Sequence, residues 1–169
     1  RLMRAAEEKN VEIKICSNVF PVRVIDGVQL EIISPFEKND LFSSGTYEDV
    51  NNNSIVIRLI FGTVSFLFTG DILGDREKIL EEKVPNLFSN ILKVPHHGSS
   101  GSSEENFVKK VSPDFAIVSC RLFGEKTELA ENILNNYTEL GSKVIRTDLR
   151  GAVEIETDGK EYTVNCLKN

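Results

Sequence analysis

Two short stretches of this chain place side chains that can bind a metal ion at the ends of apolar, strand-like runs. The first run ends in Thr69-Gly70-Asp71, and the second ends in Pro95-His96-His97-Gly98-Ser99, which holds both histidines of the chain. A carboxylate and an imidazole at the ends of neighbouring strands project from a rigid sheet edge and can converge on one cation. We therefore predict that Asp71, His96 and His97 form a catalytic metal site.

Each stretch also has an ordinary structural explanation. Thr-Gly-Asp is typical of a turn with an Asx-type hydrogen bond, and a histidine pair can simply be solvated. The matching flanks of the two stretches favour the functional interpretation. In extended backbone, neighbouring side chains point to opposite sides, so one of His96 and His97 would bind metal and the other would contact substrate or support the ligand. The sequence leaves open which histidine has which role.

Small residues follow the histidine pair. Gly98 allows the chain to turn sharply, and Ser99 or Ser100 can donate a hydrogen bond to an anionic substrate oxygen or serve only as a turn residue. Other catalytic motifs are absent from the sequence, which has no GxSxG element and no phosphate-loop or dinucleotide fingerprint. Metal-assisted chemistry is therefore the best-supported class.

The composition is that of an ordinary globular domain. The chain has 169 residues, 40% of them hydrophobic and 27% charged, which fits a single domain with a sizeable core. The net charge of -6 opposes long-range attraction to a polyanion, but a bound metal ion can supply local positive charge for a phosphodiester substrate. Cys16, Cys120 and Cys166 are far apart and lack CxxC spacing, so we expect free, reduced cysteines.

No targeting or membrane segment is evident in the sequence. The apolar run 55–61 is too short to span a bilayer and contains Arg58, and residues 1–10 lack the apolar centre of a signal peptide. The chain begins with Arg1 within an expected helix, so we expect a fragment of a longer protein. Its location is left open between the cytoplasm and attachment to a membrane-protein parent.

Periodicity predicts a mixed α/β domain in which strand hairpins alternate with helices that cover a sheet face. Hairpin turns are expected at Asp26-Gly27, Phe61-Gly62 and Asp158-Gly159, and residues 34–53 are expected to form a long surface loop. Strands are predicted at 11–15, 22–24, 28–33, 54–60, 63–68, 90–94, 114–118, 143–146, 151–156 and 161–166, and helices at 1–9, 75–83, 104–111 (capped by Ser103) and 128–140.

Several ordered motifs together resemble the metallo-β-lactamase-fold hydrolases of the ComEC type, over roughly residues 10 to 160. They are Asn53-Ser-Ile-Val-Ile-Arg-Leu59, Phe66-Leu-Phe-Thr-Gly-Asp71, Ile91-Leu-Lys-Val-Pro-His-His-Gly-Ser99, Ser112-Pro-Asp-Phe-Ala-Ile-Val-Ser119 and Arg146-Thr-Asp148 through Gly151. The resemblance implies a four-layer αββα sandwich of mixed, mostly antiparallel sheets with a metal site at one sheet edge. It also implies hydrolysis of phosphodiester or related ester bonds, with Asp71 as a metal-bridging carboxylate and the histidine pair as ligand and neighbour.

Two departures from the family pattern are visible. The HxHxDH motif, which supplies most metal ligands in the family, is absent, so residues 1–169 are expected to be a partial domain without the N-terminal half of the fold. Where many relatives have Tyr-Gly-His-Pro, this chain has Phe123-Gly-Glu-Lys126, in which Glu125 is either a replacement ligand or an exposed helix-start residue. A catalytic zinc site needs about three protein ligands, so this chain alone should bind metal weakly and catalyse poorly.

These features predict the C-terminal part of a metal-dependent hydrolase. In the complete enzyme, two divalent ions, zinc or manganese, would activate water against a phosphodiester or small ester substrate, with DNA as one candidate. The alternative is a degenerate module of the same fold that binds a partner without catalysis. A partial sandwich should also expose apolar surface, which predicts self-association.

Overall fold

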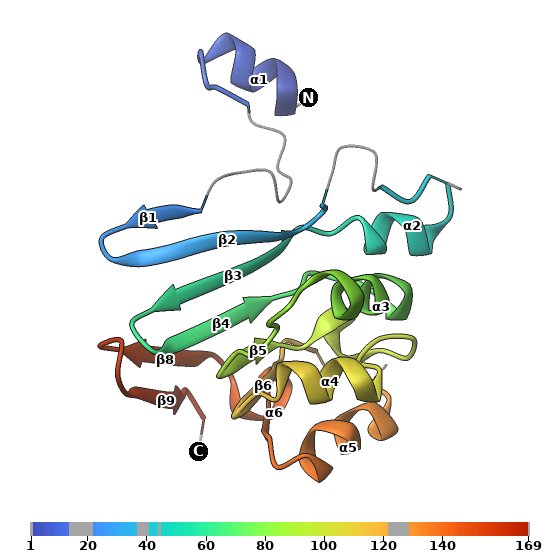
Figure 1. Ribbon diagram of the computed structural model, residues 1–169, viewed down its shortest axis with the longest axis vertical. Coiled ribbons are helices and arrows are strands. Elements are labelled where there is room, and N and C mark those ends of the chain that lie inside the picture. Colours follow the sequence, from blue (N-terminus) through green and yellow to red (C-terminus); the bar gives the residue numbers. More distant parts are fainter. Residues whose placement is uncertain (1, 14–21, 37–40, 44, 122–128, 169) are drawn as a thin grey trace.

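The computed structural model describes residues 2–13, 22–36, 41–43, 45–121 and 129–168, and its described strands form one seven-stranded sheet and a separate hairpin (Figure 1). The sheet runs in sequence order, with β1 to β4 antiparallel and β4 to β7 parallel. Its strands are β1 (Arg23–Ile25), β2 (Val28–Ser34), β3 (Val56–Phe61), β4 (Val64–Phe68), β5 (Ile91–Lys93), β6 (Phe115–Val118) and β7 (Lys143–Arg146). The hairpin consists of β8 (Val153–Thr157) and β9 (Tyr162–Cys166).

The helices between the parallel strands lie on one face of this sheet (Figure 1). α3 connects β4 to β5, α4 connects β5 to β6, and α5 connects β6 to β7. The helices are α1 (Leu2–Glu8), α2 (Tyr47–Asn52), α3 (Gly74–Lys83), α4 (Glu105–Val111), α5 (Glu131–Glu139) and α6 (Thr147–Arg150), with a 3-10 turn, η1, at Pro95–Gly98. Parallel strands require such crossovers, and the consequence is that β4, β5 and β6 all end at the same sheet edge.

A single hydrophobic core fills the space between the sheet and helices α3, α4 and α5. Alternate residues of the strands enter it, and these include Leu67, Leu92 and Val118, which are fully buried. Leu80, Phe107 and Tyr137 meet them from the three helices. The mixed α/β class predicted from periodicity is thus confirmed, with antiparallel pairs in the majority when the hairpin is counted.

Among the described residues, the β8–β9 hairpin covers part of the opposite face of the sheet. Val153 and Ile155 of β8 line an apolar hollow of about 280 Å³ together with Phe66, Phe68 and Ile117 of the sheet. The hairpin turn docks on the β3–β4 turn, where Thr63 donates its backbone N–H to the Gly159 carbonyl at 2.7 Å. On these strands Ile57 and Leu59 are partly exposed, and Phe68 is 43% exposed.

Three sequence predictions require correction. Residues 34–53 are not a continuous loop, because α2 forms there with a capping box between Thr46 and Asp49. Ser103 does not cap α4; it has a φ of 61°, and the N-cap position is Glu104. Val11 to Ile13 are not in a strand, and the rest of that predicted strand lies outside the described residues.

Candidate metal centre

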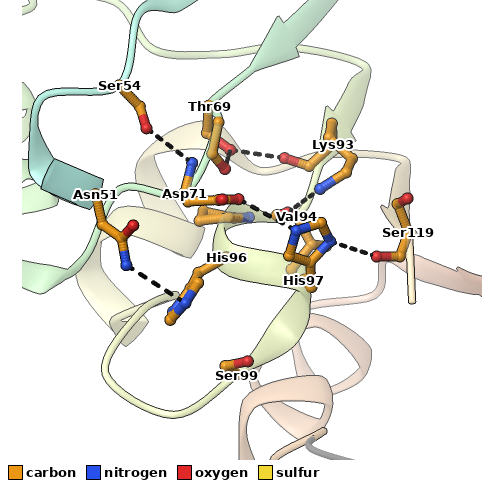
Figure 2. Close-up of polar contacts among 12 residues, drawn as sticks. Asn51, Ser54, Thr69, Asp71, Lys93, Val94, His96, His97, Ser99 and Ser119 are labelled. Atoms are coloured by element: carbon orange, nitrogen blue, oxygen red, sulfur yellow. Dashed lines mark hydrogen bonds and ion pairs between the residues drawn. The ribbon is translucent and has the colours of Figure 1, made fainter. Parts of the chain in front are cut away.

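The side chains of Asp71 and His97 meet at the edge where β4 and β5 end (Figure 2). Asp71 Oδ1 lies 3.4 Å from His97 Nε2, and both side chains are about half-exposed to solvent. Two ligand atoms bound about 2.1 Å from one tetrahedral ion lie about 3.4 Å apart. The spacing of these two atoms therefore fits two ligands of a single metal ion.

The orientation of the His97 ring is fixed from the neighbouring strand. Its Nδ1 lies 2.6 Å from the carbonyl oxygen of Ser119, at the end of β6. A carbonyl can only accept, so Nδ1 carries the proton and donates it, which leaves the lone pair of the neutral ring on Nε2. A histidine whose second nitrogen donates to a backbone carbonyl is the usual arrangement of a metal ligand. In His97 the lone pair on Nε2 faces Asp71.

Asp71 is positioned by its backbone and by a close approach of the preceding glycine to β3. Its N–H donates to Ser54 Oγ at 3.1 Å. Gly70 has a φ of 60°, and a Cβ at this position would lie 2.7 Å from the Cβ of Ser54. Only glycine meets both requirements, and this explains why a glycine precedes Asp71.

His96 and His97 do not lie in extended backbone, contrary to the sequence prediction. Both have left-handed φ values, 44° and 57°, and are followed by Gly98 at 79°. Non-glycine residues in this region are strained, and such strain is often found at functional sites. The turn is held in place by hydrogen bonds from His96 N–H to the Gly70 carbonyl and from Ala130 N–H to the Gly98 carbonyl.

His96 points away from Asp71, toward α2 (Figure 2). Its Nε2 lies 3.5 Å from Asn51 Nδ2, while its Nδ1 is buried and has no hydrogen-bond partner. The structure therefore brings His97, and not His96, to the carboxylate. The division into ligand and neighbour remains a prediction, with His97 now the better candidate for the ligand.

A hollow of about 470 Å³ opens over the two side chains. Of the predicted substrate contacts, Ser99 lines it, whereas Ser100 is exposed and is not among its lining residues. Glu125, the predicted replacement ligand, lies outside the described residues. The residues lining this hollow are Tyr47, Asp71, His96, His97, Ser99, Ser119, Cys120, Arg121 and Leu129.

The sequence reasoning did not single out Tyr47, Arg121 or Lys93. Tyr47 belongs to α2, which was expected to be loop, and Arg121 follows the end of β6. Lys93 donates its Nζ to the Val94 carbonyl at 2.8 Å, and burial lowers its pKa while the Asp71 carboxylate raises it. A lysine in an otherwise apolar strand was the available signal for this residue.

The end of β6 is clamped by the residues that follow β7. Thr147 Oγ1 accepts from Cys120 N–H at 2.9 Å and donates to the Cys120 carbonyl at 3.0 Å. The Cys120 thiol donates to Asp148, whose carboxylate also receives two hydrogen bonds from Arg146. The Arg146 guanidinium lowers the pKa of Asp148, and burial raises the pKa of Cys120. This clamp fixes the carbonyl that orients His97.

In the part of the chain that the structure describes, no group of three or more His, Cys, Asp or Glu residues is arranged to hold a metal ion. Asp71 and His97 are thus two donors where a catalytic zinc site uses about three. The two side chains fit a metal ion by spacing and tautomer, but the described residues do not complete its coordination.

The fold is a mixed sheet with helical crossovers, and it places a carboxylate and an imidazole together at the carboxyl ends of its strands. Residues 5–120 match the model of the metallo-β-lactamase superfamily. This match covers more than half of the chain, and the chain therefore belongs to the metallo-β-lactamase superfamily.

Similar proteins include the competence protein ComA of Neisseria gonorrhoeae, which is 35% identical over 130 residues, or 76% of this chain. The ComE operon protein 3 of Bacillus subtilis is 29% identical over 154 residues, or 91% of this chain. Recombination protein 2 of Haemophilus influenzae is 38% identical over 69 residues, which are 41% of this chain and 8% of that protein. The chain spans 18% of the length of ComA and 19% of the ComE operon protein.

The superfamily match and the similarity to ComA and to ComE operon protein 3 confirm the resemblance to the ComEC type that the motifs indicated. None of the helices in the described ranges combines the length and apolar character needed to cross a membrane.

Proposed function

We propose that this chain supplies part of the metal centre of a hydrolase that cleaves phosphodiester or related ester bonds with a metal-activated water. The observation that carries the proposal is the 3.4 Å approach of Asp71 Oδ1 to a His97 Nε2 whose lone pair is set by the Ser119 carbonyl. Imidazole and carboxylate donors suit zinc, and manganese also accepts carboxylates. When bound, such an ion supplies a nucleophilic water at neutral pH and Lewis acidity toward the scissile group.

The residues of the chain have distinct roles in this proposal. Asp71 and His97 hold the metal, and the strained turn at His96 and His97 keeps the imidazole at the sheet edge. Ser99 can donate its hydroxyl to an anionic substrate oxygen, because it lines the same hollow. The Arg121 side chain lines this hollow too and adds positive charge where an ester oxyanion would develop.

The names of similar proteins support DNA as the substrate class, whereas the net charge makes local cations necessary. The chain carries a net charge of -6, so attraction of a polyanion would depend on the metal and on local cations such as Lys93 and Arg121. One similar protein is named as a competence protein, one as a ComE operon protein and one as a recombination protein. We propose DNA as the phosphodiester to test first.

We also propose that this chain alone is a poor catalyst. The described residues bring two donors together, and a centre with two ions needs more donors than Asp71 and His97 offer. The open sheet face beside the β8–β9 hairpin fits the same view, because apolar side chains such as Phe68 would be covered by a further part of the domain or by a second copy. Self-association of the isolated chain is the expected consequence.

Metal titration of the purified chain tests the site. We expect zinc to bind weakly to the full chain in isothermal titration calorimetry, and Asp71→Asn and His97→Ala each to lower the affinity by at least about tenfold. Asp158→Asn, which removes an exposed carboxylate from the β8–β9 turn, is the matched control and should leave the affinity unchanged. Equal affinities for all four proteins would refute the role of Asp71 and His97.

The incomplete donor set favours a second candidate, a binding module that keeps the fold without catalysis. Metal content and hydrolytic activity separate the two candidates. Stoichiometric metal together with hydrolysis of a phosphodiester such as bis(p-nitrophenyl) phosphate supports the hydrolase. A metal-free protein that still binds DNA supports the binding module.

A further inference from the structure

A buried carboxylate on α3 holds the loop that follows the histidine turn. Both oxygens of Glu77 accept backbone N–H groups, from Ser103 at 2.6 Å and from Glu104 at 2.8 Å. Glu77 is fully buried, and no ion-pair partner of its carboxylate occurs among the described residues. The carboxylate thus holds the backbone of Glu104, at the N-cap position of α4, and of Ser103, the residue before it.

Ser103 is the point at which the loop is fixed. It is a buried residue with a left-handed φ of 61°. Its hydroxyl accepts from Tyr137 Oη at 2.8 Å and its carbonyl accepts from Asn136 Nδ2 at 3.1 Å, both from α5. Glu77 is the member of this group whose charge can change near neutral pH, because the tyrosine ionises only in strongly alkaline solution.

The same loop leads back to the candidate site. Ser102 Oγ donates to the Ser99 carbonyl at 3.1 Å, and Gly74 N–H donates to the Gly101 carbonyl at 2.9 Å. Ser99 lines the hollow over Asp71 and His97. A change in the hydrogen bond between Glu77 and Ser103 can therefore be transmitted to Ser99 through the few residues of this loop.

The surroundings of Glu77 oppose its ionisation. Glu81 on α3 and Glu104 at the start of α4 add negative charge, while Tyr137 on α5 contributes a neutral hydroxyl. The neighbouring Arg76 points elsewhere, since its Nε donates to the Asn52 carbonyl and its guanidinium lies over the Phe42 ring. Burial, opposed by the two backbone hydrogen bonds, raises the pKa of Glu77 to about 7.

We propose that Glu77 is a positioning residue whose ionised carboxylate fixes the loop of residues 99–104, and whose protonation releases one of the two bound amides and loosens the position of Ser99. A protonated carboxyl keeps one good acceptor oxygen, so it cannot satisfy both N–H groups equally. This inference goes beyond the proposed hydrolase and does not need it, because the hold on the loop exists with or without a metal ion.

Amide NMR on the full chain tests the proposal directly. In a titration from about pH 5.5 to about pH 8.5, the amide protons of Ser103 and Glu104 should shift with a common midpoint, and the Glu77 side-chain carboxyl carbon should shift with the same midpoint. The amide of Ser99 should follow them. Amide exchange of Ser103, after correction for the intrinsic pH dependence, should be several-fold faster in the protonated state.

Glu77→Gln should abolish the inflection, and Glu82→Gln, which changes an exposed glutamate of the same helix, should keep it. Should Glu77→Gln fail to fold, the carboxyl-carbon titration of the unmodified chain still decides the question. The proposal is overturned if the Ser103 and Glu104 amides show no common inflection, or if they do and Ser99 does not follow. Neither result bears on zinc affinity, so failure here is distinguishable from failure of the proposed metal site.

Discussion

The two faces of the seven-stranded sheet differ in how completely their apolar side chains are covered. Leu67 and Phe68 are consecutive residues of β4 and point to opposite faces. Leu67 enters the core under the helices and is fully buried, whereas Phe68 on the other face is 43% exposed. The same strand therefore has one side inside a completed core and one side beside a hollow that the β8–β9 hairpin only partly closes.

This difference assigns folding stability and self-association to opposite faces of the sheet. Helices α3, α4 and α5 and the inner sheet face bury enough apolar surface to form one continuous core. The outer face has the apolar character of an interior but the exposure of a surface, which is typical of an interaction site. We expect the inner face to determine folding stability and the outer face to determine association.

The largest expected effect is on the inner face. Leu67→Ala should lower the free energy of unfolding by about 2 to 5 kcal/mol, because it removes buried methyl groups and leaves a cavity. Phe68→Ala should lower it by less than about 1 kcal/mol, because much of that ring is already in water. Urea denaturation of both variants measures the contrast, and equal losses would show that the outer face is also a core.

The second effect is the pH dependence of folding stability that arises from Glu77, the buried acid of α3. The pKa of Glu77 is about 7 in the folded chain against 4.5 for an ordinary glutamate, so the folded state binds the proton more tightly. Its contribution to stability is complete below about pH 4.5 and is lost as the pH rises to about 7, a change of about 3 kcal/mol. Denaturant midpoints across this range should therefore fall with rising pH, and a flat profile after Glu77→Gln would assign the slope to this residue.

The third effect tests the outer face. Phe68→Lys places a charge on the apolar surface beside the hollow under the hairpin and should weaken self-association by about tenfold. Sedimentation velocity over a range of concentrations measures the change. Lys78→Glu, on an exposed position of α3, is the control. A chain that stays monomeric at every concentration would contradict the association model.

Most of the sheet could be predicted from the sequence, because its strands carry strong local signals. Alternation and two-residue turns located the hairpin at Asp26-Gly27, and β7 was predicted with its observed bounds. The β3–β4 hairpin was also predicted, but its turn is Gly62-Thr63, one residue later than Phe61-Gly62. Helix α2 was not predicted, because it lacks such a local signal. Its buried residues are all polar, so it has no apolar periodicity, and only the Thr46–Asp49 capping box marks it in the sequence.

The candidate site could be predicted in residue type but not in geometry. The ends of β4 and β5 predicted that Asp71 and a histidine would share one edge, and Asp71 and His97 do lie there in contact. The assignment between His96 and His97 depends on a left-handed turn that no pattern of residue types specifies. The orienting carbonyl belongs to Ser119, which directly follows β6 and lies 22 residues from His97 in the sequence, and such a contact exists only once the parallel sheet has formed.

The smallest expected effect is at α2, which tests whether polar contacts can hold an element that contributes no apolar side chain to the core. Thr46 Oγ1 accepts from Asp49 N–H at 3.2 Å, and loss of such a cap costs about 1 kcal/mol. Thr46→Ala should therefore speed amide exchange in α2 about fivefold through local opening and leave the urea midpoint almost unchanged.

Thr138→Ala is the matched control, since the Thr138 hydroxyl bonds only to carbonyls of its own helix α5. Because Asn51 of α2 lies 3.5 Å from His96, opening of α2 should also shift the His96 ring signals and leave those of His97 in place. A loss of global stability as large as that of Leu67→Ala would mean that α2 belongs to the cooperative core despite its polar burial. Unchanged exchange would mean that the Asp49 contacts to Gly45 and Thr46 are sufficient to cap the helix.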